Sequence, residues 1–281
     1  MIPNVVSIAG SDPSGGAGIQ ADLKAFSAMG AYGMTVITAL TAQSTTGVRG
    51  VMPVPADWVT AQIDALAADV RIDAVKIGML GDAAVIDAVA DALERYRWPF
   101  VVLDTVMVAK SGHRLLDPDA LGALRRRLVP IADLITPNLP EAADLLGEPE
   151  ARDEEEMAAQ AGRLIDLGAR RVLLKGGHLT GIEESTDLLV EAGGAVTRLH
   201  APRVHTTNDH GTGCTLSSAI AALRPRRADW PGAVADAKAY LSGALADSGA
   251  LDVGSGHGPV HHFWQLWDQT PPGDVSRSPK S

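Results

Sequence analysis

One pattern recurs along this chain of 281 residues: a short run of β-branched and aliphatic residues, a polar or glycine-rich loop, and then an amphipathic helical stretch. The alternation is typical of a largely parallel sheet with helices on both faces, and it predicts an α/β fold. The expected core strands are Asn4–Ala9, Thr35–Ala39, Ala74–Ile77, Phe100–Leu103, Leu134–Ile135 and Arg171–Leu174. The expected helices are Gly18–Met29, Ala56–Asp69, Ala83–Tyr96, Asp117–Leu128, Pro140–Leu146, Glu154–Leu167, Gly213–Leu223 and Pro231–Ala246.

Two later runs, Glu183–Val190 and Ala195–Leu199, flank a glycine-containing turn and are expected to form a hairpin at the edge of the sheet. The chain has no internal repeat and no long linker, so a single domain over residues 1–267 is expected. The tail 268–281 contains three prolines and no apolar periodicity, and we expect it to be disordered.

The segment 25–48 has no charged residue and is long enough to cross a bilayer. Glycines and hydroxyl side chains interrupt it too often for a lipid-facing helix. We expect a helix, a turn, a buried strand and a loop, with no membrane span.

The charge balance restricts the partners that the chain can bind. Lys and Arg total 24 against 34 Asp and Glu, a formal charge of −10, which argues against nucleic acid and against membrane surfaces. The chain has one cysteine, and its N-terminus lacks the basic segment of a secretory signal. A cytoplasmic location is therefore expected.

Ligands of open α/β sheets lie beyond the carboxyl ends of the strands. The first such loop contains GAGIQA, which matches a dinucleotide-binding fingerprint. That fingerprint also needs an acidic residue about 20 positions further on, but no Asp or Glu occurs between Asp22 and Asp57. A nicotinamide or flavin site is disfavoured. Asp22 itself is either a residue of the first helical turn or a ligand for a polar substrate, and the sequence leaves both open.

The loop TTNDHGTGCT, residues 206–215, is the strongest motif for a ligand site because it runs directly into an apolar helix. Its glycines let successive backbone N–H groups turn inward, and a helix start adds unpaired donors. This is a cradle for a phosphoryl group. A glycine-rich helix start capped by Thr212 is the alternative.

Cys214 lies at that helix start, where the pKa of a thiol is commonly lowered. It could be a small buried side chain, a nucleophile paired with His210, or a donor and base at a phosphoryl-transfer site. The spacing alone does not decide between these roles.

Two carboxylates follow other strands, Asp104 and Glu141, and Asn138 lies three positions before Glu141. Mg²⁺ prefers a few carboxylates together with water and phosphate oxygens, so these residues are candidate ligands. Asn138 and Glu141 also fit a helix cap that needs no metal, and both interpretations stay open. Lys175 follows a strand and Lys238 lies on a late helix, where an ammonium could neutralise phosphate charge.

Several motifs, in order, carry a resemblance to a known family: AGSDPSGGAGIQADLKAFSAMGAYGMTVITALTAQST, VKIGML, LDTVMVAKSG, ITPNLPEA, LLKGGH and HGTGCTLSSAIAAL. From about residue 5 to residue 264 the chain resembles the bacterial hydroxymethylpyrimidine/phosphomethylpyrimidine kinases of thiamine biosynthesis. The resemblance implies a ribokinase-like three-layer α/β/α sandwich with a mostly parallel sheet and no separate lid domain. It implies a homodimer that uses ATP and Mg²⁺ to phosphorylate 4-amino-5-hydroxymethyl-2-methylpyrimidine and then its monophosphate.

The resemblance also implies roles for individual residues. Asp22 and Gln43 would recognise the pyrimidine, and Met79 and Val106 would pack against its ring. Asp104 and Glu141 would organise Mg²⁺, assisted by Asn138, while Lys175 and Lys238 would serve ATP. Gly211, Thr212, Gly213 and Cys214 would form the anion hole for the transferring phosphoryl group. Most ribokinase-like enzymes carry Asp at the position of Cys214.

Three other functions are compatible with parts of the sequence. A pyridoxal or pyridoxine kinase of the same subfamily is the nearest, although Gln43 suits an aminopyrimidine better than a pyridine ring. A ligand-binding regulator without catalytic activity would not need the set of Asp104, Glu141, Lys175 and GTGC. A cysteine-dependent hydrolase would need a covalent intermediate on Cys214.

Overall fold

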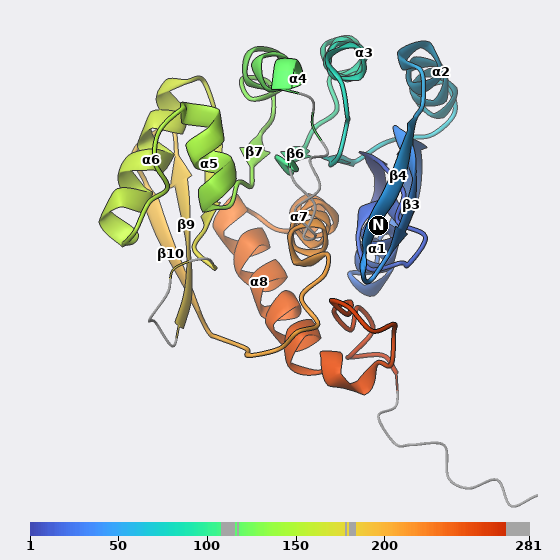
Figure 1. Cartoon of the computed structure of the whole chain (residues 1–281). Helices are drawn as coiled ribbons and strands as arrows, with labels where there is room; N and C mark the ends of the chain where they lie inside the picture. The colour runs from blue at the N-terminus through green and yellow to red at the C-terminus, as the bar shows by residue number, and fades with distance from the viewer. Residues whose placement is uncertain (108–115, 117, 178, 180–183, 268–281) are drawn as a thin grey trace, which may run out of the picture.

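The computed structural model describes residues 1–107, 116, 118–177, 179 and 184–267. Eight strands form one sheet in the order β10-β9-β8-β7-β6-β5-β1-β2 (Figure 1). They are β1 (Asn4–Ala9), β2 (Tyr32–Ile37), β5 (Ala74–Ile77), β6 (Val101–Leu103), β7 (Leu134–Ile135), β8 (Arg171–Lys175), β9 (Glu184–Glu191) and β10 (Val196–Pro202). Strands β2, β1, β5, β6, β7 and β8 are parallel, and β9 is antiparallel to both of its neighbours.

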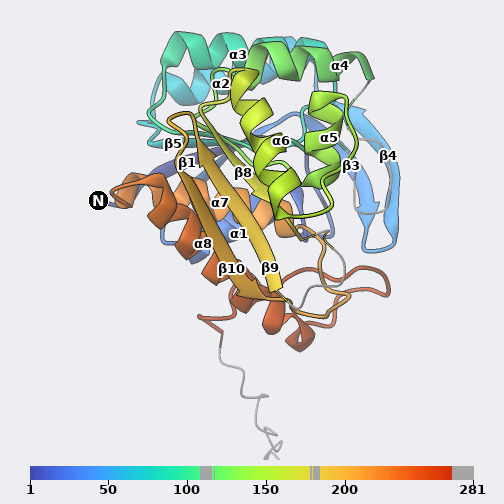
Figure 2. The ribbon, with the colours of Figure 1, turned by 90° about the vertical axis from the view of Figure 1, so that its left-hand side faces the viewer.

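Helices cover both faces of this sheet and make three layers (Figures 1 and 2). One face carries α2 (Ala56–Ala67), α3 (Ala83–Tyr96), α4 (Pro118–Ala123), α5 (Leu139–Leu146) and α6 (Glu154–Asp166). The other carries α1 (Gly18–Ala28), α7 (Thr212–Leu223) and α8 (Trp230–Ala246). Residues of the central strands alternate between two buried apolar clusters: Val75 and Leu103 pack on the first face, and Ala74 and Val102 on the second. The sheet is therefore shielded on both sides, as the continuous apolar strands predict.

The structure confirms the α/β sandwich, the six core strands and the edge hairpin, with boundaries that differ by a few residues. The helix expected over 117–128 is two pieces, because α4 ends at Ala123 and a π-helical turn, Leu124–Leu128, follows. The first residues of that helix and of the hairpin, Asp117 and Glu183, and the tail 268–281 lie outside the residues that the structure describes.

The prediction of a loop after the second strand is wrong. Residues 39–53 form a separate antiparallel pair, β3 (Ala39–Ser44) and β4 (Gly47–Pro53), with an irregular register between Ala42 and Gln43. Most side chains of this pair are exposed or half-buried, so the segment lacks the apolar alternation that identifies a strand packed on a core.

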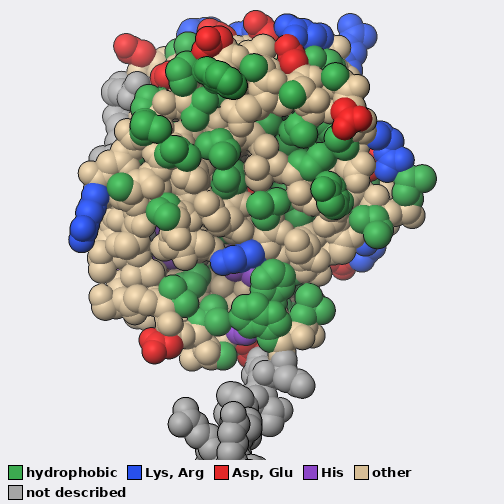
Figure 3. All heavy atoms as spheres, turned by 90° about the vertical axis from the view of Figure 1, so that its right-hand side faces the viewer, with side chains coloured by type: hydrophobic (Ala, Val, Ile, Leu, Met, Phe, Trp, Pro, Cys, Tyr) green, Lys and Arg blue, Asp and Glu red, His purple; other side chains and the backbone are tan. Residues whose placement is uncertain are grey.

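The face formed by β2, β3, β4 and α2 carries large apolar side chains at its surface: Tyr32, Leu40, Val51, Met52 and Trp58. Figure 3 shows hydrophobic side chains spread across this side of the molecule. Among the residues with described coordinates, no helix is both long and apolar enough to cross a bilayer.

Candidate active site

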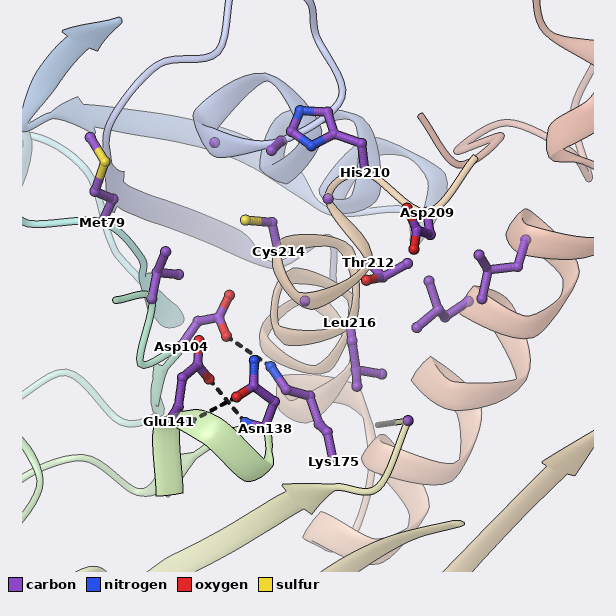
Figure 4. A pocket seen from close by; sticks show the side chains of 18 of the residues that line it. Met79, Asp104, Asn138, Glu141, Lys175, Asp209, His210, Thr212, Cys214 and Leu216 are labelled. Carbon is purple, nitrogen blue, oxygen red and sulfur yellow. Dashed lines mark hydrogen bonds and ion pairs between the residues drawn. The ribbon is translucent and has the colours of Figure 1, made fainter. Parts of the chain in front are cut away.

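A cavity of about 780 Å³ opens where the parallel strands end and α7 begins. Its lining includes twelve of the thirteen residues predicted for the site, all except Asp22: Gln43, Met79, Asp104, Val106, Asn138, Glu141, Lys175, Gly211, Thr212, Gly213, Cys214 and Lys238. Figure 4 shows several of these side chains pointing toward one another. Segments far apart in the sequence thus meet in one place, as the rule for open α/β sheets predicts.

The start of α7 is an anion cradle made by backbone. Gly211 precedes the helix with φ +79°, and a Cβ at this position would lie 1.8 Å from Gly16 O, so only glycine fits. No side chain caps the first turn, which contradicts a capping role for Thr212. The N–H groups of Thr212, Gly213 and Cys214 have no backbone acceptor within the described chain. Together with the helix dipole they favour an anion in the cavity.

A cation and a carboxylate stand beside this cradle. Lys175 Nζ at the end of β8 lies 3.3 Å from Asp104 Oδ1, which follows β6. A Cβ on Gly213 would lie 3.3 Å from Lys175 Nζ and 3.7 Å from Asp104 Oδ2, so the glycine keeps this corner open. Burial opposes ionisation of Asp104, but Lys175 and Lys76 outweigh it and lower the pKa of this carboxyl. Asp104 is therefore a charged group at neutral pH.

Glu141 and Asn138 begin α5 with a reciprocal capping box. Glu141 N donates to Asn138 Oδ1 at 2.8 Å, and Asn138 N donates to Glu141 Oε2 at 2.9 Å. The capping interpretation is thus confirmed, and both residues also line the cavity. Burial, opposed by Lys175 and reinforced by Asp104, raises the pKa of Glu141 to about 7. Two buried carboxyl groups next to each other create an electrostatic strain that a cation would relieve.

The donor set fits Mg²⁺ better than a metal held by protein alone. Within the described ranges, no group of three or more His, Cys, Asp or Glu side chains has the arrangement of a metal site. Asp104 and Glu141 supply two carboxylates at the open cavity, which suits an ion that keeps waters and shares phosphate oxygens.

Lys238 approaches from α8, which covers the opposite face of the sheet from α5 and its capping box. Its Nζ donates to Asp187 Oδ2 at 2.7 Å and to Ser185 O at 2.9 Å, and its side chain is 8% exposed. Asp187 also accepts from Gly176 N at 3.0 Å. These contacts fix the ammonium on β9, next to the edge strand β10, and Asp187 is a cavity residue that no motif in the sequence marks.

Cys214 points its sulfur into the cavity (Figure 4). The expected lowering of its thiol pKa is wrong. Burial, only partly offset by Lys76 and reinforced by Asp104, raises the pKa of Cys214 to about 11. The helix start does supply positive potential, but desolvation of the thiolate is the larger effect. Cys214 is a neutral thiol at pH 7, which removes the thiolate that a covalent hydrolase needs.

Asp22 does not join the other predicted substrate contacts. Asp22 belongs to α1, and its carboxylate is fully buried between this helix, the sheet and α7, where both oxygens lie 2.9 Å from Lys76 Nζ. Ser7 and Ser218 also donate to Asp22. These partners occupy the carboxylate inside the protein, whereas Lys76 reaches the cavity lining. Asp22 therefore holds Lys76 in place rather than facing a ligand.

Gln43, Met79 and Val106 line the part of the cavity next to β3 and the end of β5. This region also holds a pair that the sequence did not predict: His210 Nε2 lies 2.8 Å from Asp12 Oδ2. The signal in the sequence is faint, because the two residues lie 198 positions apart.

Comparison with known proteins decides which family this site belongs to. The family model described as phosphomethylpyrimidine kinase matches residues 12–261. The chain belongs to this kinase family. It is 57% identical over 264 residues, 94% of this chain and 98% of the relative, to the hydroxymethylpyrimidine/phosphomethylpyrimidine kinase of Escherichia coli. The protein is therefore a phosphotransferase.

Two solved structures place the fold among ribokinase-like kinases. The phosphomethylpyrimidine kinase of Clostridium difficile has a TM-score of 0.76 at 40% identity, covering 87% of this chain and all of that one (100%). The pyridoxal kinase of Staphylococcus aureus in complex with AMP-PCP and pyridoxal has a TM-score of 0.84 at 33% identity, covering 93% and 94%. Backbone similarity does not separate the two activities, whereas the higher sequence identity favours a hydroxymethylpyrimidine kinase over a pyridoxal kinase.

Proposed function

We propose that this kinase transfers the γ-phosphoryl group of ATP to the hydroxymethyl oxygen of 4-amino-5-hydroxymethyl-2-methylpyrimidine, and then a second phosphoryl group to the monophosphate. The observation that carries the proposal is the convergence of the α7 cradle, Lys175 and Asp104 at one corner of the cavity, with Gln43 lining the same cavity. The cradle with Lys175 and Asp104 provides for phosphate, and Gln43 provides for a heteroaromatic ring.

The pyrimidine would lie between Met79 and Val106, with its polar edge toward Gln43. Thr38 Oγ1 donates to Met79 O at 2.6 Å and ties the end of β5 to the start of β3. An apolar slot with one carboxamide suits a small neutral ring that carries nitrogen atoms on one edge.

The triphosphate would extend from the α7 cradle past Lys175 toward Lys238. The Staphylococcus aureus pyridoxal kinase bound to AMP-PCP supports a nucleotide in this fold. We assign Asp104 and Glu141 as ligands of Mg²⁺, assisted by Asn138; when bound, the ion would neutralise charge on the phosphate oxygens.

In each step the substrate oxygen forms a bond to the γ-phosphorus, the bond from phosphorus to the β-phosphate oxygen breaks, and ADP leaves. The hydroxyl proton of the first step passes to water in the open cavity as the new bond to phosphorus forms. The loose transition state of phosphoryl transfer needs positioning and charge stabilisation more than a strong base. A Cys214 with a pKa of about 11 fits that requirement, because its thiol can donate a hydrogen bond but is not a ready proton acceptor.

The remaining assignments concern the whole molecule. We assign residues 1–267 to one kinase domain acting in the cytoplasm as a homodimer. The exposed apolar side chains Tyr32, Met52 and Trp58 support self-association on the face of Figure 3. Sedimentation velocity of the wild type and of a Trp58→Glu variant tests the dimer.

The activity is tested by incubating the protein with ATP, Mg²⁺ and the hydroxymethylpyrimidine and by following products with mass spectrometry. The proposal expects the monophosphate first and the diphosphate later, with ADP formed in step. Absence of both phosphates would overturn it, and a monophosphate that never proceeds to diphosphate would overturn the second step.

A further inference from the structure

Asp12 and His210 form a buried pair beside the residue assigned to the pyrimidine edge. His210 Nε2 lies 2.8 Å from Asp12 Oδ2 and 3.3 Å from Gln43 Nε2. The side chains of His210 and Asp12 are 9% and 2% exposed. Figure 4 shows His210 at the end of the cavity away from Glu141 and Lys175. The pair is therefore placed to act on the ring end of the cavity.

The surrounding loops hold both side chains in one orientation. Asp12 Oδ1 accepts from the backbone and hydroxyl of Ser14, and Oδ2 accepts from Ala17 N at 2.8 Å. A Cβ on Gly16 would lie 2.4 Å from His210 Cδ2, so the first loop packs directly on the imidazole. The backbone N–H of His210 donates to Gly258 O at 3.0 Å. The imidazole has little room to rotate.

The charge of Asp12 determines where His210 carries a proton. Burial opposes ionisation of Asp12, but hydrogen bonds from His210, Ser14 and Ala17 outweigh it and lower the pKa of this carboxyl. An ionised carboxylate can only accept a hydrogen bond, so the 2.8 Å contact requires a proton on His210 Nε2. This holds for the neutral tautomer and for the imidazolium alike.

A protonated Nε2 in turn selects one orientation of the Gln43 carboxamide. The two ends of a carboxamide have nearly the same size, and the hydrogen-bond network decides which end faces a donor. The single Nε2–H donates to Asp12 at 2.8 Å, so Nε2 has no lone pair left to accept from a Gln43 NH₂ group at 3.3 Å, whereas Oε1 can share the same hydrogen as a second acceptor. We infer that the Asp12–His210 pair is a positioning device that turns Gln43 Oε1 toward His210 and leaves the Gln43 N–H donors for the substrate.

The consequence for selectivity rests on the proposed function. If the Gln43 donors face the ring, the edge opposite them must present an acceptor, such as an unprotonated ring nitrogen. The 4-amino pyrimidine has such a nitrogen at N3. The 4-oxo analogue, 5-hydroxymethyl-2-methylpyrimidin-4(3H)-one, carries N3–H there and would meet donor with donor, an unsatisfied buried pair that lowers kcat/KM.

The first test needs no activity. Long-range ¹H–¹⁵N correlation spectra of the wild-type protein report which nitrogen of His210 carries the proton, with the His210→Gln spectrum used for assignment. We expect a protonated Nε2 at pH 7 and at pH 8. An unprotonated Nε2 overturns the inference, whether or not the protein proves to be a kinase.

The second test compares kcat/KM for the 4-amino and 4-oxo alcohols. The wild type should favour the amino compound by about 100-fold. His210→Phe keeps a ring but lacks the donor, and this ratio should fall by about tenfold or more. His210→Gln, whose Nε2 can donate from a similar place, should restore most of the ratio. His257→Gln alters an exposed histidine 3.0 Å from Asp209 and serves as the matched control.

An unchanged ratio in His210→Phe, even with a lower kcat for both alcohols, would assign His210 a structural role only and overturn the inference. Failure of the wild type to phosphorylate either alcohol would contradict the proposed function instead, and the proton on His210 would still decide the orientation of Gln43.

Discussion

Lys175 Nζ lies 3.3 Å from Asp104 Oδ1 and stands directly beside Gly213, at the start of α7. The cation and the carboxylate come from β8 and the end of β6, two strands separated by β7, and α7 brings backbone N–H donors to the same corner. One small volume thus holds a positive charge for the transferring phosphoryl group, a carboxylate that can bind a cation, and an anion cradle. In an acidic chain of net charge −10, this local arrangement is what makes a phosphate site feasible.

Replacing Lys175 with Met should lower kcat/KM for ATP by about 100-fold or more, because a charge that is aimed at developing phosphate charge is lost. In this variant the Asp104 carboxylate still interacts with the nearby ammonium of Lys76, so the fold should persist. Steady-state kinetics with thermal unfolding as the control test this. A loss smaller than about threefold in kcat/KM would remove Lys175 from the phosphate site.

The raised pKa of Glu141 predicts a pH-dependent requirement for Mg²⁺. Only the ionised carboxylate binds the metal, and with a pKa of about 7 it loses its charge as the pH falls below that value. The Mg²⁺ concentration for half-maximal activity should therefore rise as the pH falls from about 8 to about 6. Glu141→Gln should abolish this dependence and lower activity throughout. A half-saturating Mg²⁺ concentration that does not change with pH would contradict the assignment.

The raised pKa of Glu141 also predicts how the free energy of unfolding changes with pH. Because the folded state favours the protonated form, Glu141 costs folding free energy once the pH exceeds its ordinary pKa of 4.5, and the cost is complete above about 7. Denaturant unfolding without Mg²⁺ should show the wild type losing stability over this range relative to Glu141→Gln. Equal slopes for the two proteins would contradict the raised pKa.

Gly213→Ala should impair transfer more than folding. The new Cβ would lie 3.3 Å from Lys175 Nζ and 3.7 Å from Asp104 Oδ2, where the phosphoryl group has to approach. We expect kcat to fall by about 100-fold, with little change in the unfolding temperature. Gly162→Ala is the matched control, because that helical glycine has open space around it and should only gain helix stability. Full activity of Gly213→Ala would mean that phosphate does not approach this glycine.

The buried pair of Asp22 and Lys76 should be a stability element. Lys76→Met leaves Asp22 as an unpaired charge in the interior, which costs about 3–5 kcal/mol of unfolding free energy. Combining it with Asp22→Leu should recover part of that loss. The half-exposed pair of Arg71 and Asp73 is the control, where Arg71→Met should cost less than about 1 kcal/mol. Urea denaturation measures the wild type, the single variants Lys76→Met, Asp22→Leu and Arg71→Met, and the double variant, and additive losses for the first pair would contradict the coupling.

Fully buried elements could be predicted closely from sequence. Ala74–Ile77, Leu134–Ile135 and Ala83–Tyr96 have the predicted boundaries, because strands covered on both faces and an amphipathic helix leave clear apolar patterns. The strands β3 and β4 could not be predicted in this way, because most of their side chains are exposed or half-buried and their sequence lacks the apolar alternation of a core strand.

The cavity residues were predictable where a motif follows a strand, as with Asp104, or leads into a helix, as with Gly213. Asp22 was not, because a carboxylate at the start of a helix looks the same whether it binds a substrate or a lysine 54 positions away. The thiol of Cys214 also escaped prediction, because the desolvation that raises its pKa arises only when α7 packs against the sheet.

Competition between two alcohols tests the central claim most directly. An equimolar mixture of the hydroxymethylpyrimidine and pyridoxal, with limiting ATP and excess Mg²⁺, gives the ratio of the two kcat/KM values from the products in one mass-spectrometric time course. The account predicts that pyrimidine monophosphate accumulates first and is converted to the diphosphate while most of the pyridoxal remains. Faster formation of pyridoxal phosphate would contradict it.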